Sequence, residues 1–428
     1  MIPRRILIAA LILLIPPVMT CDDNPSDGGK VVLPAIGDYV VFAWNDLGMH
    51  CLNPTYDQGV ILPPYNTVWA QVVRRGDPPQ IVTAGLTAEY RILGNTYSYG
   101  KRSYGQFWDN VTLLFGTDLA HDTGLNLDDP GVHNGLSGTM IAKADHFVAS
   151  GIPVTPVDDA DEWNPYQVAE ITIKDGGGNV VAQTRATVPT SDDINCTRCH
   201  GANPFQDVLA KHDAAHATTL VADAPVLCAG CHASPALGGT SPEGNYLSKV
   251  IHQSHSSRDA ACYDCHPGPI MACNRSQGHT AADGNCALCH GDMTNVAGTI
   301  AAGTRVPWVN EPKCVSCHVG ITGVETGLVL YRNASGHGDL YCAACHSSPH
   351  AMIPSTQASD NYQAMQYQGK AVTIGSCGAC HSGSRGESDE IEEFAEKHGG
   401  LNPDQMTACN ICHTAVSSET PGWPHAYH

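Results

Sequence analysis

The pattern Cys-x-x-Cys-His occurs eight times between residues 196 and 413 of this 428-residue chain. The motifs use 16 of the 19 cysteines and eight of the 22 histidines. They are Cys196, Cys199 and His200; Cys228, Cys231 and His232; Cys262, Cys265 and His266; Cys286, Cys289 and His290; Cys314, Cys317 and His318; Cys342, Cys345 and His346; Cys377, Cys380 and His381; and Cys409, Cys412 and His413. Two thiols and an imidazole at this spacing can take part in metal or redox chemistry.

The repetition decides between the chemistries that this spacing allows. One such motif alone is compatible with a zinc site or a redox-active dithiol. Neither requires a histidine directly after every second cysteine, whereas covalent haem attachment does: the thiols form thioethers with the haem vinyl groups, and the histidine becomes an axial ligand of the iron. The eight copies therefore predict eight haem c groups, with the 16 motif cysteines as attachment points and the motif histidines as iron ligands.

Ten further histidines lie in the same region, and we expect most of them to be second axial ligands. A lone surface histidine is ordinarily a solvated side chain, but histidine is far commoner here than in average proteins. The pairs His212/His216 and His252/His255 have spacings that put both rings on one helix face, so each pair can serve two neighbouring irons. The expected ligands are His212, His216, His252, His255, His279, His337, His350 and one of His398 or His425, with the terminal His428 the weakest candidate.

The N-terminus predicts export. Arg4 and Arg5 precede an apolar run over residues 6–15, which is shorter than the roughly 20 residues that span a bilayer. Cys21 in VMTC stands where a bacterial lipoprotein carries its lipid, and a secreted chain without lipid is the alternative. We expect a signal peptide with a lipobox-like cysteine over 1–21 and a tether over 22–30. The expected location is the outer membrane, the cell surface or the extracellular space, or else the periplasmic face.

The charge of the chain restricts its partners. The formal net charge is −20. Phosphate binding requires a basic surface, so nucleic acid is excluded as a partner. Cationic or mineral acceptors and other proteins fit this charge better. Membrane contact is expected only through a lipid anchor at Cys21.

Two regions are expected to position these residues. Residues 31–190 are rich in aromatic residues and predict a β-sandwich-like domain, with strands in DYVVFAW (38–44), NTVWAQVV (66–73), NVTLLF (110–115) and a hairpin over 166–188 that turns at DGGGN. Residues 191–428 have too few apolar side chains to offset their ordering entropy. We therefore expect haem groups to fill that interior, with short helices and little regular secondary structure around them.

Two cysteines remain besides Cys21 and the motif thiols. Cys51 lies in the β-rich region and Cys273 in the haem region. An oxidising compartment allows them to form a disulfide, and two buried free thiols are the alternative.

Three blocks carry a resemblance to a known family. LAKHDAAHATTLVADAPVLCAGCHASPALG, CYDCHPGPIMACNRSQGHTAADGNCALCHG and GHGDLYCAACHSSPHAMIPSTQ resemble multihaem c-type cytochromes of metal-reducing and related bacteria, over residues 190–428. The resemblance implies low-potential haems with two histidine ligands each, His337 and His350 among them, arranged as a chain at or beyond the outer membrane. Some relatives polymerise into conductive filaments, so a monomer and a self-assembled filament are both compatible with the resemblance, and redox-partner proteins or a mineral acceptor are the expected partners. WNDLGMHC (44–51) is similar to a segment at the front of such exported cytochromes, and no activity follows from it.

Octahaem enzymes are the alternative. Relatives of hydroxylamine oxidoreductase and of nitrite and tetrathionate reductases need one iron with an open coordination site, often marked by Cys-x-x-Cys-Lys. All eight motifs here end in histidine, and candidate second ligands are plentiful. We therefore expect an electron carrier without catalytic residues, and keep reduction of a small nitrogen or sulfur oxyanion as the second hypothesis.

Overall fold

The fold comes from a computed structural model that describes residues 36–194, 196–241, 243–268, 270–279, 286–318 and 329–382, which all belong to one compact unit. Some predicted residues lie outside these ranges: Cys21, the eighth motif with Cys409, Cys412 and His413, and the candidates His398, His425 and His428. Their roles in lipid attachment or haem binding therefore stay predictions. The same holds for the signal peptide, the tether and the domain boundary near residue 190.

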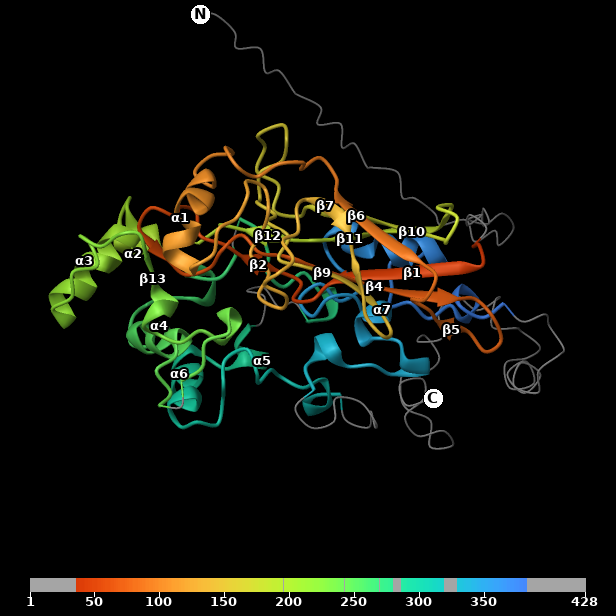
Figure 1. The fold of residues 1–428 in the computed structure, drawn as a ribbon. Coiled ribbons are helices and arrows are strands. Elements are labelled where there is room, and N and C mark those ends of the chain that lie inside the picture. The colour runs from red at the N-terminus through yellow and green to blue at the C-terminus, as the bar shows by residue number, and fades with distance from the viewer. Residues whose placement is uncertain are drawn as a thin grey trace, which may run out of the picture. The chain divides into compact units, whose positions relative to one another are not determined.

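Two antiparallel sheets occupy the N-terminal part of the chain, as predicted (Figure 1). The first has the order β1 (Tyr39–Asn45), β4 (Thr67–Arg74), β9 (Phe147–Ser150), β8 (Ile141–Ala142), with β5 (Gln80–Ile81) also paired to β4. The second has the order β11 (Val180–Thr187), β10 (Val168–Lys174), β6 (Thr87–Ile92), β7 (Ser137–Thr139). Two short parallel pairs join β2 (His50–Cys51) to β12 (Thr190–Ser191) and β3 (Gly59–Val60) to β13 (Val226–Leu227).

One hydrophobic core lies between the two sheets. Val41 of β1 and Val72 of β4 pack in the same cluster as Ile171 and Ile173 of β10, and all four side chains are fully buried. Alternate residues of a strand point to the same face, so the alternating apolar pattern of the sequence supplies this core directly. The predicted hairpin is also present, because β10 and β11 pair with Val168 opposite Thr187 and turn through residues 175–179.

The prediction of a strand over residues 110–115 is wrong. These residues form the end of α1 (Gly105–Phe115), whose buried side chains are Phe107, Trp108, Val111 and Leu114. That spacing is helical, and it becomes visible only when the two aromatic residues before the predicted strand are counted. The helix ends at Gly116, which has a φ of 70° in the left-handed region.

Short helices and turns make up the described part after residue 196, as predicted. The helices are α2 (Thr197–His200), α3 (Pro204–His216), α4 (Leu247–His255), α5 (Cys286–His290), α6 (Met293–Ala301), α7 (Cys342–His346) and α8 (Tyr362–Gln368). Single 3₁₀ turns cover Cys228–Gly230, Pro235–Leu237, Cys262–Asp264, Gln277–His279, Cys314–Ser316, Tyr331–Asn333, His337–Asp339, Ala358–Asn361 and Cys377–Ala379. Among the described residues, no helix combines the length and the apolar character needed to cross a bilayer.

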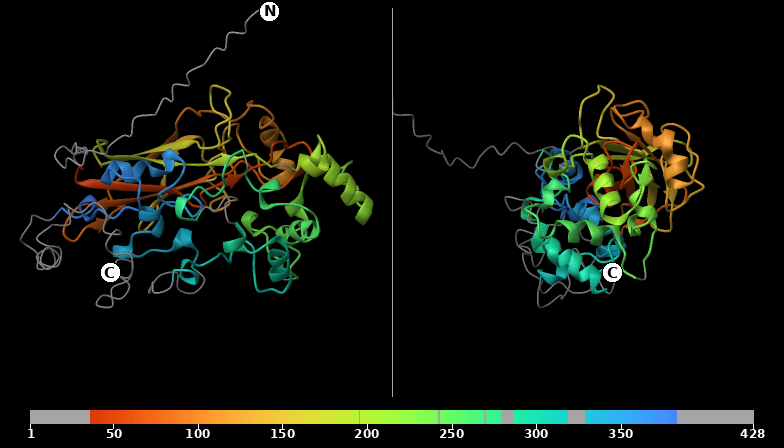
Figure 2. Two further views of the ribbon diagram at one scale, coloured as in Figure 1. Left: turned by 180° about the vertical axis from the view of Figure 1, so that it is seen from behind. Right: turned by 90° about the vertical axis from the view of Figure 1, so that its left-hand side faces the viewer.

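The second half of the chain packs directly on the sheets. Figure 2 shows the blue segments after residue 330 beside the strands in both views. A second hydrophobic cluster joins Phe42 and Trp44 of β1 to Tyr341 and Ala344 around α7 and to Tyr367 of α8. The outer face of β1 is therefore buried by the region that carries the sixth and seventh Cys-x-x-Cys-His motifs.

Candidate haem centres

The seven motifs within the described residues share one local conformation. In five of them the backbone N–H of the histidine donates to the carbonyl of the first cysteine, at 2.8 to 3.0 Å, and the other two motifs form α5 and α7. Residues three and four apart in a helical turn lie on the same side. Both thiols and the imidazole of each motif are thus presented together, as a flat group attached at three points requires.

The motif thiols differ in their exposure. The second cysteine is exposed in four described motifs: Cys199, Cys231, Cys289 and Cys317. The first cysteine of each of these motifs is half-buried. The physical reason is the composition of this region, which has too few apolar side chains to cover every thiol with polypeptide. These four sulfurs therefore lie at the surface of the polypeptide, where a group that attaches covalently can reach them.

Six motif histidines each lie opposite a second histidine, and every second histidine is one of the predicted ligands. The distances between ring centres span only 6.0 to 6.3 Å. The pairs are His200 with His255, His232 with His212, His266 with His252, His290 with His350, His318 with His279, and His381 with His337.

This separation fits one iron between the two rings of each pair. An imidazole nitrogen binds a transition metal at about 2 Å, and the ring centre lies about 1 Å behind that nitrogen, so two axial imidazoles have centres about 6 Å apart. Two histidines that stack on an aromatic ring lie closer, at 3.5 Å for His121 on Tyr99 and 4.2 Å for His146 on Trp69, whereas His50 lies 6.1 Å from Tyr65. The donor set also fits haem, since iron accepts imidazole on both faces.

Hydrogen bonds to Nδ1 hold several of these rings and leave Nε2 for the metal. His252, His255 and His350 use Nδ1 to bond a backbone carbonyl, at 2.6, 2.8 and 3.0 Å. A carbonyl only accepts, so Nδ1 carries the proton and Nε2 keeps its lone pair. Such partners fix the orientation of metal-binding histidines. On the motif side, Nδ1 of His200 lies 2.7 Å from the Asp207 carboxylate.

Burial favours the neutral, metal-binding form of two rings. Loss of solvation lowers the pKa of His266 to about 4, with smaller contributions from His252 and His350. Loss of solvation likewise lowers the pKa of His290 to about 4. Both imidazoles are therefore uncharged near neutral pH, as a ligand to iron must be.

One helix connects the first motif to the third. His252 and His255 lie on α4, where His255 faces His200 of the first motif and His252 faces His266 of the third. Arg198 of the first motif also pairs with Asp264 of the third. The two histidines of α4 therefore each lie opposite the histidine of a different motif.

The remaining described motifs extend this neighbourhood in both directions. The second motif joins the first through α3, which carries Asp207 beside His200 and His212 opposite His232. The third adjoins the fourth, because His350, opposite His290, also lowers the pKa of His266. Cysteines of the fifth, sixth and seventh motifs all pack in the cluster around Trp44. Neighbouring motifs therefore run in the order 2–1–3–4, and the fifth, sixth and seventh motifs share one hydrophobic cluster.

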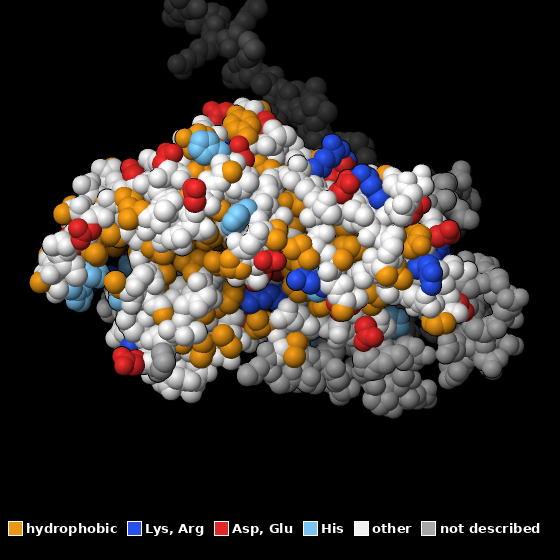
Figure 3. Space-filling model, viewed as in Figure 1, with side chains coloured by type: hydrophobic (Ala, Val, Ile, Leu, Met, Phe, Trp, Pro, Cys, Tyr) orange, Lys and Arg blue, Asp and Glu red, His pale blue; other side chains and the backbone are white. Residues whose placement is uncertain are grey.

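Some predicted ligands are not brought opposite a motif histidine. His216 is exposed and lies against His212, with ring centres 4.8 Å apart. Figure 3 shows histidine atoms at the surface beside α3, on a face where acidic and basic side chains are interspersed. The six pairs do not include His346, and its second ligand stays unassigned. Cys51 and Cys273 are both free thiols in the structure.

Within the described ranges, no three His, Cys, Asp or Glu side chains converge as a cage for a bare metal ion. No family model, curated protein or solved structure matches this chain. The interpretation of the site therefore depends on the geometry of its own histidines and cysteines.

Proposed function

We propose that this chain is a multihaem c-type cytochrome that carries electrons. The observation that supports the proposal is the set of six histidine pairs, whose ring centres are 6.0 to 6.3 Å apart beside cysteines that share one turn geometry. The six pairs join both near and distant parts of the chain, from His252 with His266 to His290 with His350, and one enclosed group common to all of them accounts for their shared spacing. We propose one haem c group for each of the eight Cys-x-x-Cys-His motifs, including the eighth, which lies outside the described residues.

The residues of each pair determine what the site can do. Haem iron, when bound, supplies a one-electron exchange between its ferric and ferrous forms. An imidazole on each face leaves no position for a substrate, so the pair favours electron transfer over reduction of a small molecule. Nδ1 bonds such as those of His252 and His255 hold the rings in place in both oxidation states, and two histidines favour a lower potential than histidine with methionine.

The neighbour relations support a path along the chain. Elements shared between adjacent motifs, such as α4, hold two centres at a fixed separation, and the order 2–1–3–4 differs from the sequence order. We place the protein outside the cytoplasm, at or beyond the outer membrane, anchored by lipid at Cys21. Its proposed partners are redox proteins or a mineral acceptor, and self-assembly into filaments is the alternative to a monomer that the family resemblance allows.

The proposal is tested on the exported protein. The haem content is measured by the pyridine haemochrome method, and low-temperature EPR of the oxidised protein is recorded with and without nitrite or hydroxylamine. We expect eight covalent haems, all low-spin and indifferent to the added ligand. A protein without covalent haem would refute the proposal. One high-spin haem that binds nitrite would instead favour the octahaem reductase.

A further inference from the structure

The loop Asn45–Gly48, which follows β1, is built to hold one conformation. The buried Asn45 side chain accepts hydrogen bonds from the backbone N–H of Leu47 at 3.1 Å and of Gly48 at 2.6 Å. Its amide nitrogen donates to Asn66 and to the Thr67 carbonyl. Hydrogen bonds of the Asn45 side chain therefore close the loop on itself and attach it to Thr67, the first residue of strand β4.

This loop contacts His350, the histidine opposite His290. Nδ1 of His350 lies 3.0 Å from the carbonyl of Leu47, which can only accept, so the ring donates. Two residues earlier, the Ser348 hydroxyl donates to the carbonyl of Asn45 at 2.7 Å. The loop thus holds both the ring of His350 and the turn from which that ring projects, although the two segments are about 300 residues apart.

Gly48 makes this contact possible. Its φ of +77° lies in the left-handed region, and a Cβ atom there would be 3.0 Å from the backbone nitrogen of His350 and 3.1 Å from Cβ of Ser348. A side chain at this position would push against the His350 segment itself, besides straining the backbone. Gly94 has a similar φ of +67°, but a Cβ atom there meets nothing within 4 Å. Both glycines therefore have the left-handed conformation, but only at Gly48 would an added Cβ atom contact another part of the chain.

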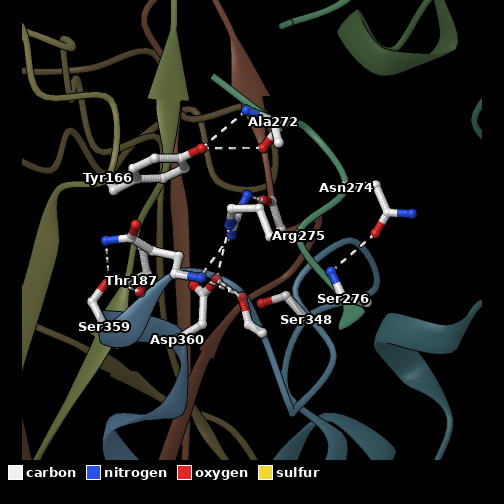
Figure 4. Close-up of polar contacts among 12 residues, drawn as sticks. Tyr166, Thr187, Ala272, Asn274, Arg275, Ser276, Ser348, Ser359 and Asp360 are labelled. Carbon is white, nitrogen blue, oxygen red and sulfur yellow. Dashed lines mark hydrogen bonds and ion pairs between the residues drawn. The ribbon is translucent and has the colours of Figure 1, made fainter. Parts of the chain in front are cut away.

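Arg275 also links the loop Asn45–Gly48 to the segment that carries His350. Its Nη1 donates to the Gly48 carbonyl at 2.9 Å, and its backbone N–H donates to the His350 carbonyl at 2.7 Å. The guanidinium forms a two-point ion pair with Asp360 at 2.8 and 3.2 Å, and Figure 4 shows it between Asp360 and Tyr166. Only 1% of the Arg275 side chain is exposed, so this charge is buried and paired with Asp360.

We propose that the loop Asn45–Gly48 positions His350 as an axial ligand, with the Leu47 carbonyl fixing the ring and Gly48 allowing the close approach. This rests on the proposed function, since it concerns the haem of Cys286, Cys289 and His290. It gives the segment WNDLGMHC a role: the sheet region supplies part of one haem site. These are positioning residues, because none of them would touch the iron.

The test counts irons with an open position in variants of the full-length exported protein. Reduced haem with two histidine ligands does not bind carbon monoxide, whereas haem that has lost one does. The variants are Gly48→Ala, Gly94→Ala as the matched control, His350→Ala, and the double variant Gly48→Ala/His350→Ala. Carbon monoxide bound per protein is titrated by absorbance, and EPR records the number of low-spin signals lost.

We expect no carbon monoxide bound by the unchanged protein or by Gly94→Ala, and one per protein for His350→Ala. Gly48→Ala is expected to bind more carbon monoxide than the unchanged protein but no more than one per protein, and the double variant still only one, because both changes act on the same iron. Added imidazole should restore the low-spin signal in Gly48→Ala. A general loss of packing would open several haems and would not respond in this way.

Two results would overturn the inference. The first is Gly48→Ala without carbon monoxide binding and with an unchanged EPR spectrum. The second is two molecules bound by the double variant, which would place the effect of Gly48 at another iron. If Gly48→Ala does not accumulate, Ser348→Ala replaces it: we expect one EPR signal to shift, whereas the exposed Ser254→Ala should change none, and an unchanged spectrum would count against the loop. Absence of haem from the unchanged protein would refute the proposed function rather than this inference.

Discussion

The hydroxyl of Tyr367 bonds to both backbone groups of Val41, donating to its carbonyl at 2.7 Å and accepting from its N–H at 3.2 Å. Tyr367 lies on α8, between the sixth and seventh motifs, and Val41 lies on the outermost strand of its sheet. Gln363 of the same helix accepts from the N–H of Ala43 at 2.9 Å. Side chains of α8 therefore occupy the edge of β1, where a further strand would otherwise pair.

Replacing Tyr367 by phenylalanine should destabilise the protein by about 1–3 kcal/mol, because two buried backbone groups of Val41 lose their partner while the ring is kept. Tyr362→Phe on the same helix is the control, since Tyr362 is 37% exposed. Urea unfolding followed by far-ultraviolet circular dichroism measures both. Equal midpoints for the two variants would mean that the contact contributes nothing.

Replacing His212 by alanine should open the proposed haem of Cys228, Cys231 and His232, because His212 lies opposite His232. One low-spin EPR signal should disappear and one carbon monoxide should bind after reduction, as expected for an iron with one axial histidine. His216→Ala, one turn further along α3, should leave this haem low-spin. Eight unchanged signals in His212→Ala would contradict the pairing. A signal lost in His216→Ala would show that His216 serves a different iron, as its spacing predicts.

Replacing Arg275 by methionine should cost about 3–5 kcal/mol, because Asp360, with 2% of its side chain exposed, is left as an uncompensated buried charge. The double variant Arg275→Met/Asp360→Leu should recover part of that loss, since both charges are then removed. Lys174→Met breaks the partly exposed pair with Glu89 and should cost less than about 1 kcal/mol. Thermal unfolding of the unchanged protein and these three variants measures the differences in stability. A double variant no more stable than Arg275→Met would argue against a charge effect.

The stability should fall in acid partly through Glu170. Hydrogen bonds from Arg91, and then from Arg185, hold the pKa of this carboxyl below its usual range. A lowered pKa in the folded state means that the ionised group stabilises the fold at neutral pH, and that this contribution is lost as the pH falls through the folded-state pKa. Glu170→Gln should therefore melt a few degrees lower near pH 7, and the difference from the unchanged protein should vanish in strong acid.

The control for this pH series is Glu89→Gln, because the Glu89 side chain is 42% exposed in its pair with Lys174. Exposed pairs contribute little to stability, so its melting temperature should follow that of the unchanged protein at every pH. A gap between Glu170→Gln and the unchanged protein that is constant with pH would point to lost packing instead of lost charge.

Features that depend on neighbouring residues could be predicted from the sequence, and features that depend on distant ones could not. The motif turns, β1 and the hairpin of β10 and β11 follow from local patterns. The helix α1 was missed because its buried face begins before the apolar run at residue 110. Candidate second histidines could be named, but their partners could not, since His290 and His350 meet through segments brought together only by the fold. The contact of His350 with Leu47 uses a backbone carbonyl, which every residue type has, so the sequence does not indicate it.

The two sides of each histidine pair differ in how soon they can form. The cysteines and histidine of a motif span five residues and need only one helical turn, whereas the place of His350 opposite His290 requires contacts with the loop near Gly48 and with Arg275, which are distant in the sequence. During biogenesis of a haem-bearing chain, attachment can thus precede folding and the second ligand arrives with it. If the proposed haems are attached in this way, the number of irons with a second histidine in place would report, centre by centre, how far the chain has folded.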